Sequence, residues 1–185
     1  MKPDQVIESI RTGRLQLSFW DKFSHYWPVA ILFCISLPFL YFSLKDVMFG
    51  EYQSIPIPIL LFIVVPFILG IAAQLLQSRR LRFTSIKTKL TNEELKAIIS
   101  ETGQVEGWTL HATGNNFIVA KARPSLLLFS WGEQVTVLFD NGRVLVNSIC
   151  DPDKLSSLTS FGRNKRHVRA IVEKVKEAEM AVKVH

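Results

Sequence analysis

Two stretches decide the fold of this chain: WPVAILFCISLPFLYFSL at residues 27–44 and IPIPILLFIVVPFILGIAAQLLQ at residues 55–77. Neither stretch contains a charged residue, and each reaches the roughly 20 residues that a helix needs to cross about 30 Å of hydrocarbon. The rest of a 185-residue chain is too small to wrap both helices inside a soluble core. We therefore expect a membrane α-helical hairpin over residues 26–78, with spans at about residues 27–45 and 55–77.

The basic residues beside the spans predict their orientation. Because the link between the spans is short, the helices must run antiparallel, and both chain ends lie on one side of the membrane. The link carries Lys45 against Asp46 and Glu51. Basic residues crowd the outer ends of the hairpin: Lys2, Arg11, Arg14 and Lys22 before it, and Arg79, Arg80, Arg82, Lys87 and Lys89 after it. Since lysine and arginine favour the cytoplasmic side, we expect a multi-pass protein with N- and C-termini in the cytoplasm.

Aromatic and basic side chains near the spans predict contacts with the membrane surface. Amphipathic rings favour the headgroup layer, so we expect interfacial anchors at Trp20, Tyr26, Trp27 and Tyr52. Residues 1–25 then form an N-terminal cytosolic or interfacial arm. Residues 79–90 form a basic juxtamembrane linker that we expect to bind anionic lipid headgroups through Arg79, Arg80, Arg82, Lys87 and Lys89. Alternatively, these charges set the topology without any lipid specificity.

The interior of the spans argues against a transport path. Pro38 and Pro66 lie well inside the two predicted helices and predict a kink in each. Such kinks suit a gate or a packing site, but proline is also common in membrane helices in general. Neither span contains an ionisable residue, whereas proton relays and ion-coupled paths need such groups at depth.

Residues 91–185 have the pattern of a compact α+β module. Thr91 and Glu94 form a capping box that starts a helix, and Gly103 is expected to end it. A last helix is expected over about residues 164–181, where apolar residues recur at helical spacing.

Four β-prone runs lie between these helices and predict two hairpins, which pair residues 108–112 with 117–122 and residues 135–139 with 144–149. The first turn is expected to place Gly114 or a neighbouring asparagine at positive φ, and the second contains the strong hairpin signal Asn141-Gly142. The apolar stretch 126–131 either extends the third strand or covers the sheet as a loop. The expected module is α-β-β-β-β-α, an antiparallel four-stranded sheet with helices on one face.

The sequence contains no catalytic constellation, so we do not expect an enzyme. Its four histidines lack metal-ligand spacing, and its few glycines form no phosphate-binding motif. We therefore expect no cofactor, no metal and no small-molecule substrate. No nucleic acid is expected either, because the net charge of +6 suits an anionic bilayer and no RNA- or DNA-binding motif accompanies it. An enzyme with an unrecognised site around Cys150, His111 or Asp151 is the remaining alternative.

The start of the last helix carries the most suggestive polar cluster, with Arg163, Lys165, Arg166 and Arg169. A helix N-terminus offers unpaired backbone N–H groups to an anion. The cluster is therefore a candidate contact for a lipid headgroup, a phosphate or an acidic protein surface. The alternative is a solvated helix face.

Three stretches carry a resemblance: SWGE at residues 130–133, VNSICDP at residues 146–152 and SFGRNK at residues 160–165. They resemble segments of small bacterial two-span membrane proteins that join a membrane hairpin to a C-terminal α+β cytosolic module. The similarity covers roughly the last hundred residues. It implies no activity, and it implies a bacterial inner membrane as the location.

The leading hypothesis is a non-enzymatic, membrane-anchored adaptor or accessory subunit. Its cytosolic module would bind a protein partner, or the same module in another copy, near the inner membrane. One alternative is a membrane-active effector whose hairpins oligomerise and perturb the bilayer. Another is a sensor of anionic lipid or of a phosphate ligand.

Overall fold

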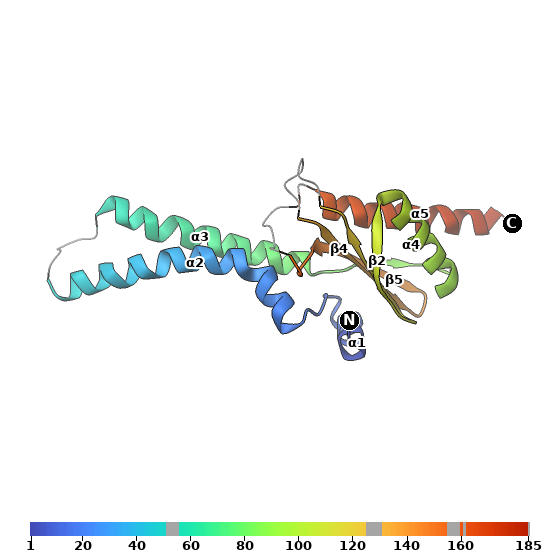
Figure 1. Cartoon of the computed structure of the whole chain (residues 1–185), viewed down its shortest axis with the longest axis horizontal. Coiled ribbons are helices and arrows are strands. Elements are labelled where there is room, and N and C mark those ends of the chain that lie inside the picture. Colours follow the sequence, from blue (N-terminus) through green and yellow to red (C-terminus); the bar gives the residue numbers. More distant parts are fainter. Residues whose placement is uncertain (51–55, 125–130, 155–159, 161, 185) are drawn as a thin grey trace. The chain divides into compact units, whose positions relative to one another are not determined.

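The computed structural model describes residues 1–50, 56–124, 131–154, 160 and 162–184. Two compact units make up the chain (Figure 1): Met1–His25 with Arg79–His185 form the first, and Tyr26–Ser78 form the second. Tyr52 and most of the apolar stretch 126–131 lie outside the described residues.

The second unit is built from two long helices, α2 (Phe19–Met48) and α3 (Ile57–Arg80). Both are long and apolar enough to cross a membrane, and only 17% of the most apolar window of each is buried. A core helix of a soluble protein would be mostly buried instead. The two predicted apolar helices are confirmed, and they suit a membrane protein. Both helices continue through their internal prolines, Pro38 and Pro66.

Aromatic side chains hold α2 and α3 together along their length. The rings of Phe39 and Phe62 stack with centroids 5.6 Å apart, and Phe33 meets Phe67 edge-on at 5.4 Å. Gly70 packs directly under Phe33, because a Cβ atom at Gly70 would lie 3.1 Å from that ring. The helices therefore pack in one antiparallel register that depends on a ring opposite a glycine.

The first unit contains a five-stranded antiparallel sheet, so the predicted four strands are one too few. Its order is β1-β5-β4-β3-β2, with β1 Thr84–Lys87, β2 Trp108–Thr113, β3 Phe117–Ala122, β4 Glu133–Asp140 and β5 Arg143–Cys150. The strand that sequence patterning missed is β1, which lies in the predicted basic linker. It has four residues and places one partly buried apolar side chain, Ile86, on the core. Its pairing comes from distant β5, where Val146 lies opposite Thr84.

Of the two predicted hairpin turns, the second is confirmed and the first is wrong in its backbone conformation. Asn141 and Gly142 have φ values of 31° and 75°, as the type I′ turn between β4 and β5 requires. The positive φ predicted at Gly114 or a neighbouring asparagine is wrong. Gly114 serves instead to admit the ring of Phe117, which would lie 2.4 Å from a Cβ atom there.

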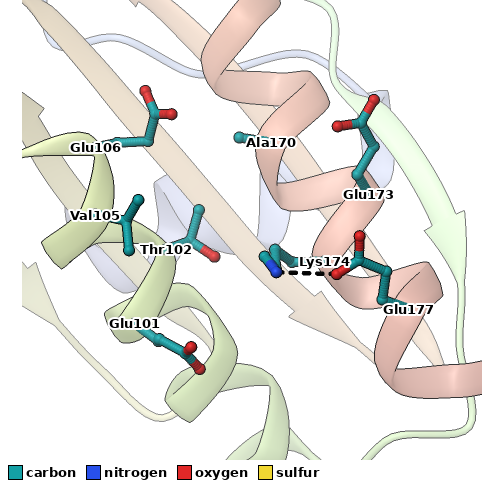
Figure 2. A pocket seen from close by; sticks show the side chains of 8 residues that line it. All are labelled: Glu101, Thr102, Val105, Glu106, Ala170, Glu173, Lys174 and Glu177. Atoms are coloured by element: carbon teal, nitrogen blue, oxygen red, sulfur yellow. Dashed lines mark hydrogen bonds and ion pairs between the residues drawn. The ribbon is translucent and has the colours of Figure 1, made fainter. Parts of the chain in front are cut away.

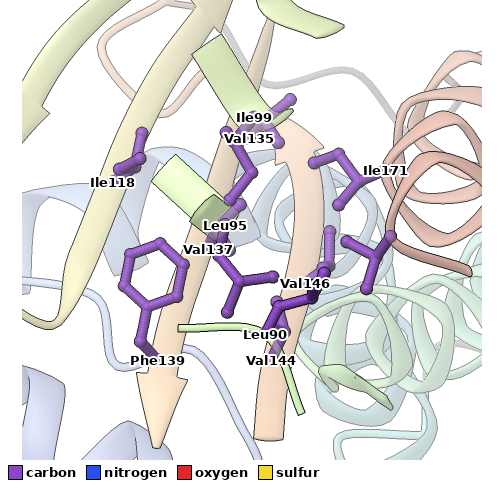
Figure 3. Close-up of a cluster of buried hydrophobic side chains, with 11 residues drawn as sticks. Leu90, Leu95, Ile99, Ile118, Val135, Val137, Phe139, Val144, Val146 and Ile171 are labelled. Carbon is purple, nitrogen blue, oxygen red and sulfur yellow. The ribbon is translucent and has the colours of Figure 1, made fainter. Parts of the chain in front are cut away.

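Two helices cover one face of the sheet, α4 (Asn92–Glu106) and α5 (Arg163–Val184). Leu95 and Ile99 of α4 and Ile171 of α5 pack on the inward side chains of β3, β4 and β5 (Figure 3). The predicted capping box is confirmed, since the Thr91 hydroxyl accepts from the Glu94 amide and the Glu94 carboxylate accepts from the Thr91 amide.

The predicted end of α4 at Gly103 is wrong. The helix continues to Glu106 and ends at Gly107, which has a φ of 71°. Gly103 is buried inside the helix, where a Cβ atom would lie 3.3 Å from the ring of Trp108. The small size of Gly103 allows α4 to pack closely on the ring of Trp108, and Gly107 provides the left-handed cap of the helix.

The N-terminal arm covers the opposite face of the sheet, so helices lie on both faces and not on one. Val6 of α1 (Pro3–Thr12) packs with Leu138 and Leu145, and Leu15 and Leu17 pack with Ile149. Backbone hydrogen bonds also join the arm to the chain that follows α3: the Leu15 amide donates to the Leu81 carbonyl, and the Phe83 amide to the Gly13 carbonyl. The arm thus belongs to the first unit, and its contact with a membrane stays a prediction.

Candidate functional site

One end of the sheet gathers most of the polar side chains that could form a site. Trp108, Ala122, Glu133 and Cys150 lie in register across β2, β3, β4 and β5. We call this the Glu133 end of the sheet. α4 ends at Glu106, just before Trp108 begins β2, so its last turn lies at this end. The first turns of α5 also lie here, because Arg163 and His167 approach Glu133.

A buried polar cluster joins the Glu133 end to the start of α5. Glu133 is fully buried, and its Oε2 lies 3.2 Å from Nη2 of Arg163 and 3.7 Å from Nε2 of His167. Trp108 Nε1 donates to Nδ1 of His167 at 3.2 Å. Since Nδ1 accepts that hydrogen bond, the neutral imidazole carries its proton on Nε2, on the side of Glu133. Glu106 completes the cluster, with Oε2 3.7 Å from His167 Nδ1.

The cluster contains an acid, a base and a cation, but its geometry favours a structural role. Glu133 and His167 are both buried, and Arg163 also donates to the Arg123 carbonyl at 3.0 Å. A buried carboxylate and guanidinium in contact satisfy each other's charge. The arrangement ties α5 and the chain after β3 to the end of the sheet.

The four predicted basic residues of α5 do not act as one group. Arg163 pairs with Glu133, and Arg166 pairs with Glu106 at 3.2 Å. Lys165 and Arg169 are exposed. Half of the predicted anion-binding charge is therefore compensated by internal carboxylates that the linear sequence does not place nearby.

The basic run after the spans is mostly exposed. Arg79, Arg82, Lys87 and Lys89 are exposed, and Arg80 is half-buried. Asn147 of β5 holds the run against the sheet, because its amide nitrogen donates to the carbonyls of Arg80 and Arg82 at 2.7 and 2.9 Å. The Lys89 amide donates to the Glu179 carboxylate at 2.9 Å. Lipid contacts of these side chains stay predictions.

Exposed aromatic rings line the start of α2. Trp20 and Trp27, predicted as interfacial anchors, are exposed, and the Tyr26 hydroxyl lies 3.2 Å from the Ser78 hydroxyl. Phe23 lies in the same aromatic cluster of the sequence, whereas Phe19 was not predicted as an anchor. The rings of both meet Trp20 edge-on, with centroids 5.4 Å away for Phe19 and 6.4 Å away for Phe23.

A groove between α4 and α5 was not predicted from the sequence (Figure 2). It holds about 150 Å³ and is lined by Glu101, Thr102, Val105 and Glu106 of α4 and by Ala170, Glu173, Lys174 and Glu177 of α5. Lys174 pairs with Glu177 at 2.9 Å, and this hydrogen bond raises the pKa of Lys174. The residues that line the groove thus carry four carboxylates and one ammonium group. Glutamates recur on the exposed faces of both helices, which was the signal for such a groove.

The three residues considered for an unrecognised enzyme site lie apart from this groove. Cys150 is buried at the end of β5, and His111 is exposed on β2. Asp151 is buried with one oxygen 3.1 Å from Lys121 Nζ, and Lys121 also bonds Asp153. That bond lowers the pKa of Asp153. Lys121 is thus held between two carboxylates that directly follow β5.

Comparison of the sequence with known protein families and with curated proteins finds no match. Function therefore has to be argued from the chemistry of the exposed surfaces. Two such surfaces stand out among the described residues: the acidic groove between α4 and α5, and the apolar helices of the second unit.

Proposed function

We propose that this chain is a non-enzymatic adaptor of the bacterial inner membrane, with both termini in the cytoplasm, whose cytosolic module binds a basic segment of a partner membrane protein. The observation that carries the proposal is the acidic groove between α4 and α5. The hairpin of α2 and α3 is the membrane anchor, and its exposed apolar side chains support that role.

The groove suits a cationic partner because its charge opposes that of the whole chain. The net charge of the chain is +6, yet the groove carries four glutamates and one lysine. Within the described residues, ion pairs engage Glu106 and Glu177 but not Glu101 or Glu173. Val105 is exposed at the rim and offers an apolar contact beside these charges. Opposed charges of this kind steer association and select partners.

A juxtamembrane segment is the cationic partner that the position of the module favours. Membrane proteins concentrate lysine and arginine beside their spans on the cytoplasmic side. A module tethered by its own spans on that side meets such segments at high effective concentration. Because the effective concentration is high, a weak intrinsic affinity of the acidic groove for such a segment is sufficient.

The test uses the full chain in lipid nanodiscs and a labelled peptide, RRLRFTSIKTKL, that copies residues 79–90 as a representative basic segment. We expect saturable binding that the double variant Glu101→Gln/Glu173→Gln weakens roughly tenfold, as the loss of about 1.4 kcal/mol would. The matched control Asp4→Asn/Glu93→Gln removes the same charge from exposed positions outside the groove.

Three results decide the matter. Loss of binding in the groove variant alone supports the proposal. Equal binding of a peptide with its basic residues replaced by glutamine would overturn it, because charge would then not be recognised. Equal loss in both double variants would also overturn it, since only overall charge would matter.

A further inference from the structure

We propose that the Glu133 end of the module is itself a lipid-facing surface that rests on an anionic bilayer through Trp131, Arg123, Lys154 and Lys165. We call these four residues the Trp131 surface. The inference rests on the membrane anchoring in the proposed function but does not depend on the acidic groove.

Chain connectivity places this end next to the bilayer. The chain leaves the first unit after His25 and re-enters it at Arg79. Ser24, just before the first crossing, donates to the carbonyl of Lys154 at 2.9 Å. After the second crossing, the Arg80 and Arg82 carbonyls are held by Asn147, and β1 then runs toward the opposite end of the sheet. The residues at which the chain leaves the first unit and returns to it are therefore held on the side of the Glu133 end.

The exposed side chains at this end combine a large aromatic ring with basic groups. Trp131 is 58% exposed and directly precedes Gly132 and β4. Lys154 approaches the same point, because its Nζ would lie 3.3 Å from a Cβ atom on Gly132. Arg123 is exposed after β3, and Lys165 is exposed in the first turn of α5.

The acidic groups at this end are already engaged by other cations. Glu133 pairs with Arg163, Glu106 with Arg166, and Asp151 and Asp153 with Lys121. Lys121 is shared by two carboxylates, so one negative charge remains uncompensated. Arg123, Lys154 and Lys165 outweigh it, and among the described residues named here this end of the sheet stays basic. This internal compensation, rather than the total charge of the chain, makes the surface basic.

A tryptophan ring amid lysine and arginine matches the chemistry of a membrane interface. Tryptophan prefers the headgroup layer, and each basic residue near an anionic surface contributes roughly 1 kcal/mol. Because two spans already tether the module to the membrane, a weak contact of this kind is enough to keep this surface on the lipid. The surface would set the height and tilt of the module, and so which partner segments reach its groove.

The test places a polarity-sensitive fluorophore on the full chain in vesicles of phosphatidylcholine with or without phosphatidylglycerol. Pro124→Cys puts the reporter beside the Trp131 surface without removing any of its four residues. Met180→Cys on α5 is the control, because Met180 is 60% exposed, much like Trp131, but lies toward the other end of the sheet. Both are made with Cys34→Ala and Cys150→Ala.

We expect spin-labelled lipid to quench the reporter at position 124 several-fold more than the one at 180, and phosphatidylglycerol to increase the difference. Trp131→Ser should abolish it, whereas Leu110→Ser, at a similarly exposed position on β2, should not. Equal access of an aqueous quencher to both reporters in phosphatidylglycerol vesicles would overturn the inference. So would protection of position 124 that persists in detergent without lipid, which would indicate a protein contact.

Extraction with alkaline carbonate separates failure of this inference from failure of the anchor. A chain released by carbonate would contradict the membrane anchoring in the proposed function. A chain that resists carbonate but shows a water-exposed reporter at position 124 would contradict the Trp131 surface alone.

Discussion

At the scale of single residues, Glu133 organises the start of α5. It is fully buried, and its carboxylate faces Arg163 and His167. Burying a charge is costly unless an opposite charge meets it, so the position of the carboxylate determines where α5 can begin.

Replacing Glu133 by glutamine should therefore destabilise the first unit by about 2–3 kcal/mol, because the half-buried Arg163 loses its counter-charge. Thermal unfolding of the full chain in detergent measures the effect. Glu101→Gln, at an exposed site on α4, should change the stability little. The double variant Glu133→Leu/Arg163→Met should recover part of the loss, and no recovery would contradict an electrostatic cause.

At the scale of elements, the packing of α2 on α3 depends on a local size match. Gly70 leaves room for the ring of Phe33, and stacked or edge-on rings continue the contact on the side of the link. Without a hydrophobic driving force between helices in lipid, close van der Waals packing determines their register.

Gly70→Leu should weaken this packing by about 1–3 kcal/mol, since the larger side chain must displace the Phe33 ring. Unfolding of the chain by increasing concentrations of a denaturing detergent measures this loss of stability. Ala72→Leu adds similar bulk at an exposed position of α3 and serves as the control. Adding Phe33→Ala to Gly70→Leu should restore part of the resistance; a further loss instead would show that the ring and the glycine act independently.

Local sequence patterns predicted some features of these elements and missed those that depend on residues distant in the sequence. The Asn141-Gly142 turn and the Thr91 capping box were predictable because each acts between residues a few positions apart. Strand β1 was not, because it exists through its pairing with β5, about sixty residues later. Gly103 and Gly114 were misassigned for a related reason: each accommodates an aromatic ring, and periodicity does not show where a ring points.

At the scale of the whole molecule, the distribution of basic residues predicts which side of a membrane each part would occupy. The link between α2 and α3 has few basic residues, whereas the segments beside the outer ends of the helices have many. Translocating those outer segments would be unfavourable, so both should stay in the cytoplasm.

Labelling of single cysteines in intact cells tests this topology. Phe49→Cys, at the end of α2 next to the link, should react with a membrane-impermeant maleimide from outside. Met180→Cys on α5 should react only after the membrane is permeabilised. Both carry Cys34→Ala and Cys150→Ala. The opposite pattern of labelling would contradict cytoplasmic termini.

The amino-acid sequence by itself determined the two apolar helices, the order of α4, α5 and the four strands between them, the second hairpin turn and the start of α4. Each depends on hydrophobic runs, periodicity or turn chemistry, which operate over short distances along the chain. The tertiary structure decided the fifth strand, the packing of α1 on the second face and the pairing of Arg163 with Glu133. It also decided the acidic groove, whose two walls are separated by over sixty residues of sequence. These features arise only when distant segments share a buried surface, and no local pattern records which segments will meet.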